Sequence, residues 1–492
     1  MVEATERTRG WKAIFASHFW RRRRLHLVVL VWAIIYLPFL GSHEIQGEEG
    51  RRILPAVTML QTGNYLVPHV GSEPYFRKPP LINWIIAASF KLTGIRNEWT
   101  ARLPSALCIL AVALAFITIG RGALGESGAF IAALIWLTFG GSIEKGRQIE
   151  IEALYVSATA LAFICWLAAY RAGRGGMRLW FWPAVFLGLG ALAKGPLPHL
   201  LFFYGPVIAL LWHDRKLSLL LRPAHVLALL IIFGIFCAWA LPMYLVSDRS
   251  RMAVVWSKQV TGRVAGVGFQ LGSWITNIPR SLAYFLPWVL LGVLQIGSAD
   301  DRKRSRYFLA GIAVPFVAMN LVPVALPRYA MPAMGATAWW LAELLCAPEL
   351  HWPRWLSGSV FNSRRRDQVI ALVVVLMTLG GFAYAVARTP RKNQTEKVRK
   401  YARQIDAVVP AGVPVFAVNP EYQPYLFYLR GPVLYASSLD ELPADTLFFM
   451  VRARDENEAA TTTRWSPRRT QMVLHMKDYR GLESILFAVV PR

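Results

Sequence analysis

The sequence predicts an all-α polytopic membrane protein with a small α/β domain at its C-terminus. The chain has 492 residues, of which 55% are hydrophobic and only 17% are charged, whereas a soluble domain carries about 25% charged residues. Its mean hydropathy is +0.38. The 54 Lys and Arg exceed the 29 Asp and Glu, but they alternate with apolar runs, which is typical of loops between membrane spans. This distribution argues against nucleic acid as a partner.

The apolar runs predict about eleven or more transmembrane helices within residues 27–388. A span needs about 20 apolar residues, and flanking Arg and Trp side chains allow somewhat shorter ones. The runs are Leu27–Leu40, Leu103–Ile119, Gly128–Ile143, Ala153–Tyr170, Leu179–Ala193, Leu197–Trp212, Ala224–Val246, Leu282–Ile296, Tyr307–Leu326, Tyr329–Leu345 and Val369–Val386.

The orientation follows from the basic residues. Residues 1–26 include the block Arg21–Arg24 just before the first span, which predicts a cytoplasmic N-terminus. A twelfth apolar run, Pro79–Leu92, is expected to lie along the membrane surface, because every predicted cytoplasmic turn is then basic. These turns are Arg121, Arg171–Arg178, Arg215–Arg222, Arg302–Arg306 and Arg354–Arg366. The outer side then holds the long loop 41–102 and the segments Ser142–Glu152 and Ser247–Arg280.

The composition becomes polar from Thr389 onward, which predicts a separate domain over residues 389–492. Glu396–Val408 and Glu421–Leu429 have helical spacing. Strands are expected at Val413–Val418, Val433–Tyr435, Leu447–Val451 and Ile485–Val490. An odd number of spans places this α/β domain on the outer, extracytoplasmic side.

The outer loop 41–102 concentrates ionisable side chains beside apolar segments, among them Glu48, Arg51 and Lys78. A carboxylate at the membrane edge can act as a general base, and clustered Lys and Arg can hold a phosphate. The alternative interpretation is a solvated loop with surface ion pairs.

Three residues outside this loop extend the candidate site. Glu152 opens a span, where the helix dipole alone would explain a carboxylate. Lys194 lies in an apolar turn without an acid nearby in sequence, so it either reaches to the membrane surface or neutralises an anion. Arg328, at the outer end of a helix, has the same two interpretations. A lipid phosphate is the anion expected at this depth.

Six short motifs stand in a specific order over about residues 27 to 345. They are Glu48-Glu49 with Arg51, Gly63-Asn64-Tyr65, Tyr75-Phe76-Arg77-Lys78-Pro79-Pro80, Ala101-Arg102-Leu103-Pro104-Ser105, Lys194-Gly195-Pro196 and Leu326-Pro327-Arg328-Tyr329. In this order they resemble the polyprenyl-phosphate-sugar-dependent glycosyltransferases of the C superfamily. The resemblance is to the aminoarabinose transferases that modify lipid A in particular, and more distantly to the protein O-mannosyltransferases.

The resemblance implies a glycosyltransferase C-type fold and assigns roles to residues. Glu48, in the catalytic outer loop 41–102, takes the place of the base, and Glu152 takes the place of a second acid. The residues implied to bind the lipid phosphate are Arg51, Lys78, Lys194, Tyr329, Tyr75 and Arg328. The sequence departs from the family pattern in three places: both acids are Glu where Asp is common, Arg77 replaces an acid, and the segment Trp256–Gln259 lacks acidic and His residues. The Glu changes preserve base chemistry, whereas the other two departures leave the sugar and any metal site open.

The implied enzyme is an inverting glycosyltransferase of the bacterial inner membrane. It moves a single sugar from a polyprenyl-phosphate donor to an acceptor at the outer face, either lipid A, another envelope glycolipid or a protein. Phosphate leaves as a stable anion, so Lys and Arg suffice to stabilise it, while Glu48 takes the proton of an acceptor hydroxyl. No cofactor is required, although a divalent ion between Glu48 and Glu152 stays open.

Two other functions are compatible with these features. A lipid or sugar transporter would also be basic and helical, but it should show repeat symmetry, and the sequence shows no internal repeat. A non-catalytic homologue that binds a lipid phosphate within the membrane would keep the same cations.

Overall fold

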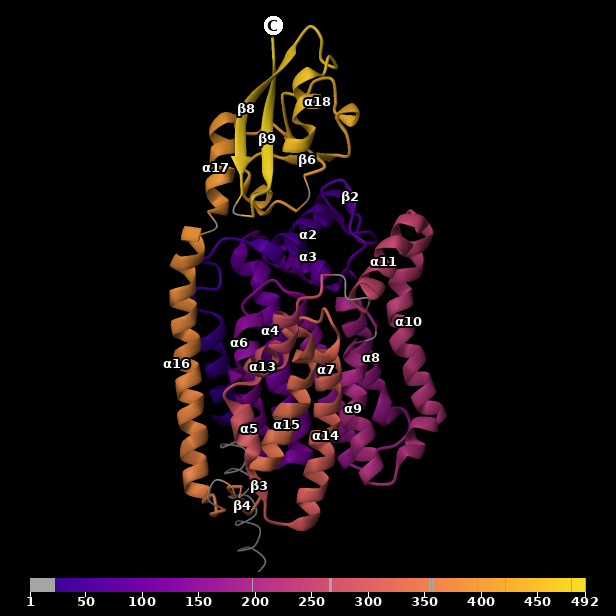
Figure 1. Cartoon of the computed structure of the whole chain (residues 1–492), viewed down its shortest axis with the longest axis vertical. Helices are drawn as coiled ribbons and strands as arrows, with labels where there is room; N and C mark the ends of the chain where they lie inside the picture. The colour runs from indigo at the N-terminus through magenta and orange to yellow at the C-terminus, as the bar shows by residue number, and fades with distance from the viewer. Residues whose placement is uncertain are drawn as a thin grey trace, which may run out of the picture.

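The computed structural model describes residues 23–491 except 197, 265–267, 354, 356–357, 396, 421 and 479. Most of the basic N-terminal segment therefore lies outside the described residues. Figure 1 shows three layers along the long axis: a body of upright helices, a layer with α2 (Gly50–Thr62) and α3 (Leu81–Thr93), and a β-sheet at the end that carries the C-terminus.

The upright helices form the apolar body. They are a helix over residues 23–36, α4 (Glu98–Ala115), α5 (Arg121–Thr138), α7 (Ile151–Arg171), α8 (Met177–Lys194), α9 (Pro198–His213), α10 (Pro223–Val246), α14 (Ala299–Leu321), α15 (Met334–Leu345) and α16 (Ser363–Thr395). Helix α7 is almost entirely buried and packs on α8, and α8 packs on α10. Five Trp side chains fill the core: Trp136, Trp166, Trp180, Trp288 and Trp339.

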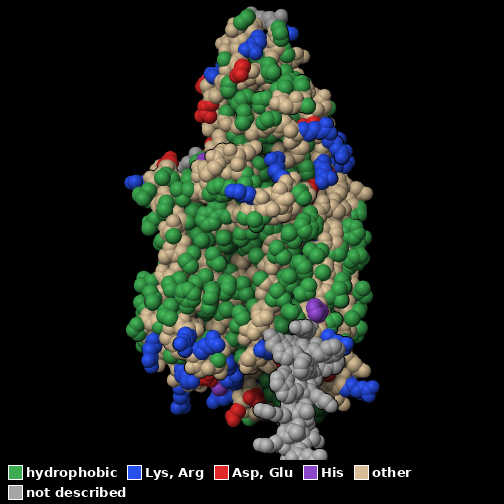
Figure 2. Space-filling model, turned by 180° about the vertical axis from the view of Figure 1, so that it is seen from behind, with side chains coloured by type: hydrophobic (Ala, Val, Ile, Leu, Met, Phe, Trp, Pro, Cys, Tyr) green, Lys and Arg blue, Asp and Glu red, His purple; other side chains and the backbone are tan. Residues whose placement is uncertain are grey.

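Large apolar side chains also cover much of the outside of the body. Within the described residues, four helical stretches are long and apolar enough to cross a membrane: Glu98–Thr138, Ile151–Arg171, Pro223–Val246 and Ser363–Arg391. Helices α10 and α16 expose large side chains such as Leu230 and Leu379. Figure 2 shows a broad hydrophobic band across one face of the body, with Lys and Arg gathered at its lower end. Such a band is stable only in a lipid environment.

The prediction of a continuous transmembrane helix over Leu282–Ile296 is wrong. Leu282–Ile296 is divided among the end of α13 (Asn277–Leu282) and the short 3-10 helices η4 (Ala283–Phe285) and η5 (Trp288–Val293). The break falls at Leu286, which has an extended backbone with ψ of 151°. Pro287 follows it, and a residue before proline is sterically excluded from the helical region. The other predicted runs overlap helical segments.

The run Pro79–Leu92, predicted to lie along the membrane surface, forms α3. Figure 1 shows α3 beside α2, between the upright helices and the sheet. At the opposite end, Arg302 donates a hydrogen bond of 2.8 Å to the carbonyl of Ile296 in β3 (Gln295–Ile296). The basic turn Arg302–Arg306 and the sheet therefore lie at opposite ends of the helical body.

Residues 398–490 form a five-stranded sheet with the order β6-β5-β7-β9-β8. The elements are α17 (Val398–Val408), β5 (Val415–Val418), β6 (Val433–Ala436), β7 (Phe448–Arg452), α18 (Glu456–Thr461), β8 (Arg469–Lys477) and β9 (Glu483–Val490). Strand β5 runs parallel to β6 and β7, whereas β9 is antiparallel to β7 and β8. The predicted helix Glu421–Leu429 is only the short 3-10 helix η7 (Pro424–Tyr428), and β8 was not predicted.

Polar contacts join the C-terminal region to the outer loop 41–102. Tyr428 donates to Glu98 over 2.8 Å and accepts the backbone N–H of Ile45 over 2.6 Å. Arg96 donates to the carbonyl of Phe427 over 3.0 Å. The guanidinium of Arg51 lies 3.9 Å from the ring centre of Tyr422. These contacts place the C-terminal residues directly over the loop that holds the candidate site.

Candidate active site

The two consecutive glutamates of the outer loop have opposite environments. Glu49 is buried and forms a bidentate pair with the fully buried Arg102, with distances of 2.9 and 2.8 Å. The backbone N–H of Ile149 donates to the same carboxylate over 3.1 Å. Burial opposes ionisation of Glu49, but Arg102 outweighs it and lowers the pKa to about 2. Glu49 therefore ties the loop to α4, and Glu48 is the glutamate available for chemistry.

Glu48 lies in the short 3-10 helix η1 (Gly47–Glu49), just before α2. Arg51 donates to both of its carboxylate oxygens over 2.9 and 3.1 Å, and Arg52 is 3.8 Å away. Arg52 also donates to the hydroxyl of Tyr75 over 2.7 Å. The side chain of Glu48 is 41% exposed, so an acceptor can reach it. The accessible carboxylate of η1 thus lies beside two cations of the first turn of α2.

Glu152 lies at the start of α7 and contacts two cations. Lys194, the last residue of α8, is 3.1 Å from Oε1 of Glu152, and Nε of Arg328 is 3.2 Å from the same oxygen. The ammonium group of Lys194 also lies 4.5 Å from the ring centre of Tyr329. The anion that the apolar environment of Lys194 demands is therefore supplied by Glu152, 42 positions away in sequence. The role of Glu152 is therefore not limited to a favourable interaction with the helix dipole of α7, because its carboxylate also pairs with Lys194 and Arg328.

The turn that leads to Glu152 is held rigidly. Arg147 donates to the carbonyls of Ile35 and Pro38, each over 2.5 Å. Lys145 pairs with Glu150 over 3.2 Å. Gly146 packs so closely that a Cβ atom there would stand 2.5 Å from the ring of Tyr36, which excludes any larger residue. This packing fixes the entry of α7 and hence the position of Glu152.

All eight predicted site residues line one cavity of about 240 Å³. They are Glu48, Arg51, Tyr75, Lys78, Glu152, Lys194, Arg328 and Tyr329, and the other lining residues are Arg52, Arg77, Glu150, Ile151 and Leu326. The loop after β2 (Glu73–Pro74), the first turns of α2 and α7, the end of α8 and the segment 326–329 meet here. Six Lys and Arg face three Glu in this lining. The cavity therefore carries excess positive charge, which favours an anionic ligand.

Three charged lining residues, Arg52, Arg77 and Glu150, were not among the predicted site residues. Arg52 and Arg77 look like ordinary loop cations in sequence, although the spacing of Arg52 from Glu48 places both on one helix face. Glu150 lies in the same acidic segment as Glu152. Burial raises the pKa of Glu150 above its usual value, although Lys145 opposes this shift.

A divalent metal between Glu48 and Glu152 does not fit the side chains that surround them. Each carboxylate already contacts two Lys or Arg side chains. Within the described part of the chain, no group of three or more His, Cys, Asp or Glu could hold a metal ion. Oxygen-rich donor sets are what Mg²⁺ and Ca²⁺ require, and cation-paired carboxylates do not offer one.

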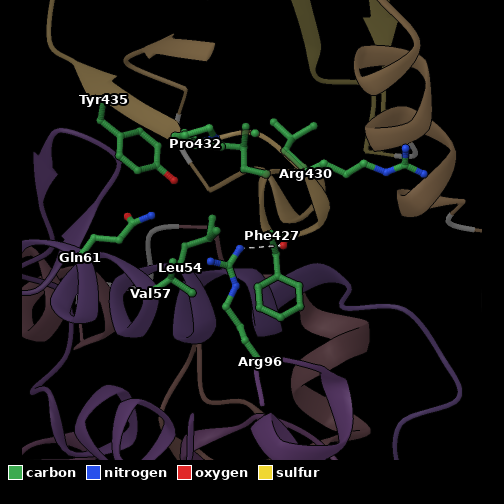
Figure 3. A pocket seen from close by; sticks show the side chains of 12 residues that line it. Leu54, Val57, Gln61, Arg96, Phe427, Arg430, Pro432 and Tyr435 are labelled. Carbon is green, nitrogen blue, oxygen red and sulfur yellow. Dashed lines mark hydrogen bonds between the residues drawn. The ribbon is translucent and has the colours of Figure 1, made fainter. Parts of the chain in front are cut away.

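A separate cavity of about 410 Å³ lies between α2 and the C-terminal residues. Figure 3 shows Leu54, Val57 and Gln61 on one side and Arg430, Pro432 and Tyr435 on the other, with Arg96 bonded to Phe427. No Asp or Glu is found among its described lining residues, and none of the predicted site residues is there. This cavity lacks a base and is not the catalytic candidate.

The chain is similar to known membrane glycosyltransferases. The family model described as dolichyl-phosphate-mannose-protein mannosyltransferase matches residues 77–241. The undecaprenyl phosphate-alpha-4-amino-4-deoxy-L-arabinose arabinosyl transferase of Pseudomonas savastanoi pv. phaseolicola is 28% identical over 328 residues, which are 65% of this chain and 60% of that protein. A protein of the same name, numbered 2, from Pseudomonas fluorescens is 27% identical over 75% of this chain and 67% of its own.

The solved structures extend this likeness to nearly the whole chain. The crystal structure of ArnT from Cupriavidus metallidurans bound to undecaprenyl phosphate has a TM-score of 0.70, with 16% identity over 95% of this chain and 98% of that chain. The apo structure of the same protein has a TM-score of 0.66 over 96% and 98%. The chain therefore has the fold of ArnT, and the predicted resemblance to the polyprenyl-phosphate-sugar-dependent glycosyltransferases of the C superfamily is confirmed.

Proposed function

We propose that the chain is an inverting membrane glycosyltransferase that moves a single sugar from a polyprenyl-phosphate donor to an acceptor. One observation carries this proposal: an accessible carboxylate and an excess of Lys and Arg line a single cavity. A lipid phosphate with an attached sugar supplies the matching chemistry, because its anion lies at the membrane surface. The names of the curated relatives, which specify undecaprenyl phosphate, support the same donor class.

The reaction uses the carboxylate and the cations that line the cavity. A hydroxyl oxygen of the acceptor attacks the anomeric carbon, and the bond from that carbon to the phosphate oxygen breaks. The polyprenyl phosphate leaves with the electron pair, and Lys78, Lys194 and Arg328 stabilise its charge without a proton donor. Glu48 accepts the proton of the hydroxyl. A single displacement inverts the anomeric centre.

Arg51 and Glu152 position the reacting groups. Arg51 holds both carboxylate oxygens of Glu48, which fixes the direction of the base. Glu152 holds Lys194 and Arg328 on a single oxygen. This preorganises two cations, which would otherwise repel each other, for the incoming phosphate. Glu152 acts as a positioning residue in this scheme.

The expected place of action is the outer face of the bacterial inner membrane, with an envelope glycolipid such as lipid A as the acceptor. Mass spectrometry of envelope lipids and glycans, with and without the gene, tests this proposal. Loss of one sugar from a glycolipid on deletion supports it. Loss of a sugar from proteins instead would identify a protein acceptor, and unchanged glycans would contradict transfer.

Replacing Lys194 with Met should weaken polyprenyl-phosphate binding by about 1.5–3 kcal/mol, which is the worth of a hydrogen bond to a charged group. The same change should lower the melting temperature of the apo protein, because the buried carboxylate of Glu152 loses its ion pair with Lys194. Affinity is measured with purified protein in nanodiscs, alongside thermal melts.

The double variant Glu152→Gln with Lys194→Met separates binding from folding. It removes both charges, so its melting temperature should return toward the wild-type value while donor binding stays weak. Recovery of donor affinity in the double variant would mean that Lys194 acts only through Glu152 and that the phosphate binds elsewhere.

The topology is tested with single cysteines in a background without the four native ones. A cysteine at the exposed Ser437, beside β6, should react with an impermeant thiol reagent from outside the cell. A cysteine at the exposed Asp300, beside β3, should react only after permeabilisation. Reaction of the Asp300 site from outside would reverse the predicted orientation and move the cavity to the cytoplasmic face.

A further inference from the structure

The guanidinium of Arg77 lines the cavity that holds Glu48 and Lys194, here called the donor cavity. The Arg77 side chain is exposed, and no ion pair or hydrogen bond joins it to another residue in the described part of the chain. The three glutamates of this lining contact other cations instead; these pairs are Glu48 with Arg51 and Arg52, Glu150 with Lys145, and Glu152 with Lys194 and Arg328. The planar fork of N–H donors of Arg77 is therefore available to a ligand.

The backbone that carries Arg77 is held on its N-terminal side. The N–H of Tyr75 donates to the carbonyl of Pro68 over 2.7 Å. Phe76 is buried, and its carbonyl accepts a hydrogen bond of 2.9 Å from the indole of Trp256. Arg77 thus combines a fixed backbone with an unengaged head group, so that a bound ligand has to order little more than one side chain.

A neighbouring cavity of about 390 Å³ locates Arg77 relative to the point of sugar transfer. Arg51, Tyr75 and Arg77 line both this cavity and the donor cavity, so the two cavities adjoin at these side chains. Arg51 is engaged with both carboxylate oxygens of Glu48, and the hydroxyl of Tyr75 accepts a hydrogen bond from Arg52. Within this shared group, Arg77 is the cation whose charge is not engaged by a described residue.

The donor phosphate does not require Arg77. In the proposed function its charge is stabilised by Lys78, Lys194 and Arg328, and a phosphate that links a lipid to a sugar carries one negative charge. Six Lys and Arg face three Glu in the lining, so the cavity stays positive after this one charge is bound. The reacting sugar lies between the phosphate and the hydroxyl that Glu48 deprotonates, which places its ring substituents near the shared group.

We propose that Arg77 binds a carboxylate on the donor sugar, so that the transferred sugar is of the uronic acid class. This inference rests on the proposed function and adds to it the chemical class of the sugar. A guanidinium group matches the two oxygens of a carboxylate in a bidentate manner. A sugar that carries an ammonium group would instead bring two positive charges together. Arg77 is a specificity-determining residue in this scheme.

The test measures donor binding in the absence of acceptor, with purified protein in nanodiscs of phosphatidylcholine. The probes are polyprenyl phosphate linked to glucuronic acid or galacturonic acid, and the neutral counterparts linked to glucose or galactose, in which a hydroxymethyl group replaces the carboxylate. Free polyprenyl phosphate is the reference. The variants are Arg77→Gln, which removes the charge, and Arg77→Glu, which reverses it.

The matched control is Arg454→Gln. Arg454 is also an arginine with an exposed side chain, at 61%, and it lines the neighbouring cavity but not the donor cavity. It therefore tests whether any loss of charge near the site has the same effect as the change at Arg77.

We expect wild-type protein and the Arg454→Gln control to bind at least one uronic acid donor about 10- to 100-fold more tightly than its neutral counterpart, as expected for hydrogen bonds between charged groups. Arg77→Gln should abolish this preference and leave the affinity for the neutral donors and for free polyprenyl phosphate unchanged. Arg77→Glu should bind the uronic acid donor more weakly than the neutral one, because like charges repel. Melting temperatures should stay unchanged, since Arg77 has no described partner to lose.

Four results would overturn the proposal. Equal binding of acidic and neutral donors by wild-type protein would exclude a carboxylate site. A preference that persists in Arg77→Gln would place the carboxylate elsewhere, and a preference lost in Arg454→Gln would place it in the neighbouring cavity. Weaker binding of free polyprenyl phosphate by Arg77→Gln would assign Arg77 to the phosphate. Failure of the proposed function is distinguishable, because wild-type protein would then bind neither free polyprenyl phosphate nor any of the four donors.

Discussion

Transfer to a hydroxyl acceptor is expected to fall by about 10²–10⁴-fold when Glu48 is replaced by Gln, the usual worth of a general base. The amide keeps the size of the side chain and can still accept a hydrogen bond from Arg51, so folding and donor binding should persist. Turnover is measured with purified protein in nanodiscs, and donor affinity and melting temperature are measured on the same samples.

The control for this prediction is Glu126→Gln. Glu126 is also partly exposed and also pairs with two arginines, Arg24 and Arg121, but it does not line the cavity. It should leave turnover unchanged. Near-normal turnover of the Glu48→Gln protein would remove Glu48 from catalysis, and loss of donor binding would show that the change had damaged the cavity itself.

Glu49→Gln should destabilise the protein by about 3–5 kcal/mol, although Glu49 is adjacent to Glu48. Arg102 is fully buried, and the change leaves its charge without a carboxylate; breaking a buried ion pair from one side typically costs this much. Glu49→Gln should abolish expression or strongly lower the melting temperature. Glu48→Gln should change the melting temperature only slightly. Equal melting temperatures of Glu49→Gln and Glu48→Gln would contradict the assignment of a structural role to Glu49 and a chemical role to Glu48.

The pH dependence of stability follows from the same pair. The folded protein holds the pKa of Glu49 at about 2, below its ordinary value of 4.5. A lowered pKa stabilises the folded state fully above the unfolded value, and this stabilisation is lost as the pH falls from about 4.5 through 2. Thermal melts between pH 3 and 7 should therefore show a smaller acid-induced decrease in Glu49→Gln than in the wild type.

Much of the helical body could be predicted because burial in lipid requires continuous apolar runs. The exceptions have local causes. Pro287 breaks the run Leu282–Ile296, which composition alone describes as a span. Strand β8 escaped prediction because most of its side chains are exposed at an edge of the sheet, so it lacks the alternating pattern of a half-buried strand.

The candidate site was predictable as a set of residue types but not as a set of contacts. The order of the short motifs singled out Glu48, Lys78 and Lys194, and the structure brings them to one cavity. The pairing of Lys194 with Glu152 depends on the packing of α7 against α8, which no local pattern encodes.

The central claim is inverting sugar transfer from a polyprenyl-phosphate donor, and one measurement tests it most directly. Purified wild-type protein in nanodiscs is given a polyprenyl-phosphate-linked sugar of known anomeric configuration together with a glycolipid acceptor. Products are followed by mass spectrometry, and the new glycosidic bond is assigned by NMR. The account predicts one sugar added per acceptor, an equal amount of free polyprenyl phosphate and an inverted anomeric centre. A retained configuration, or donor that stays intact beside a competent acceptor, would contradict it.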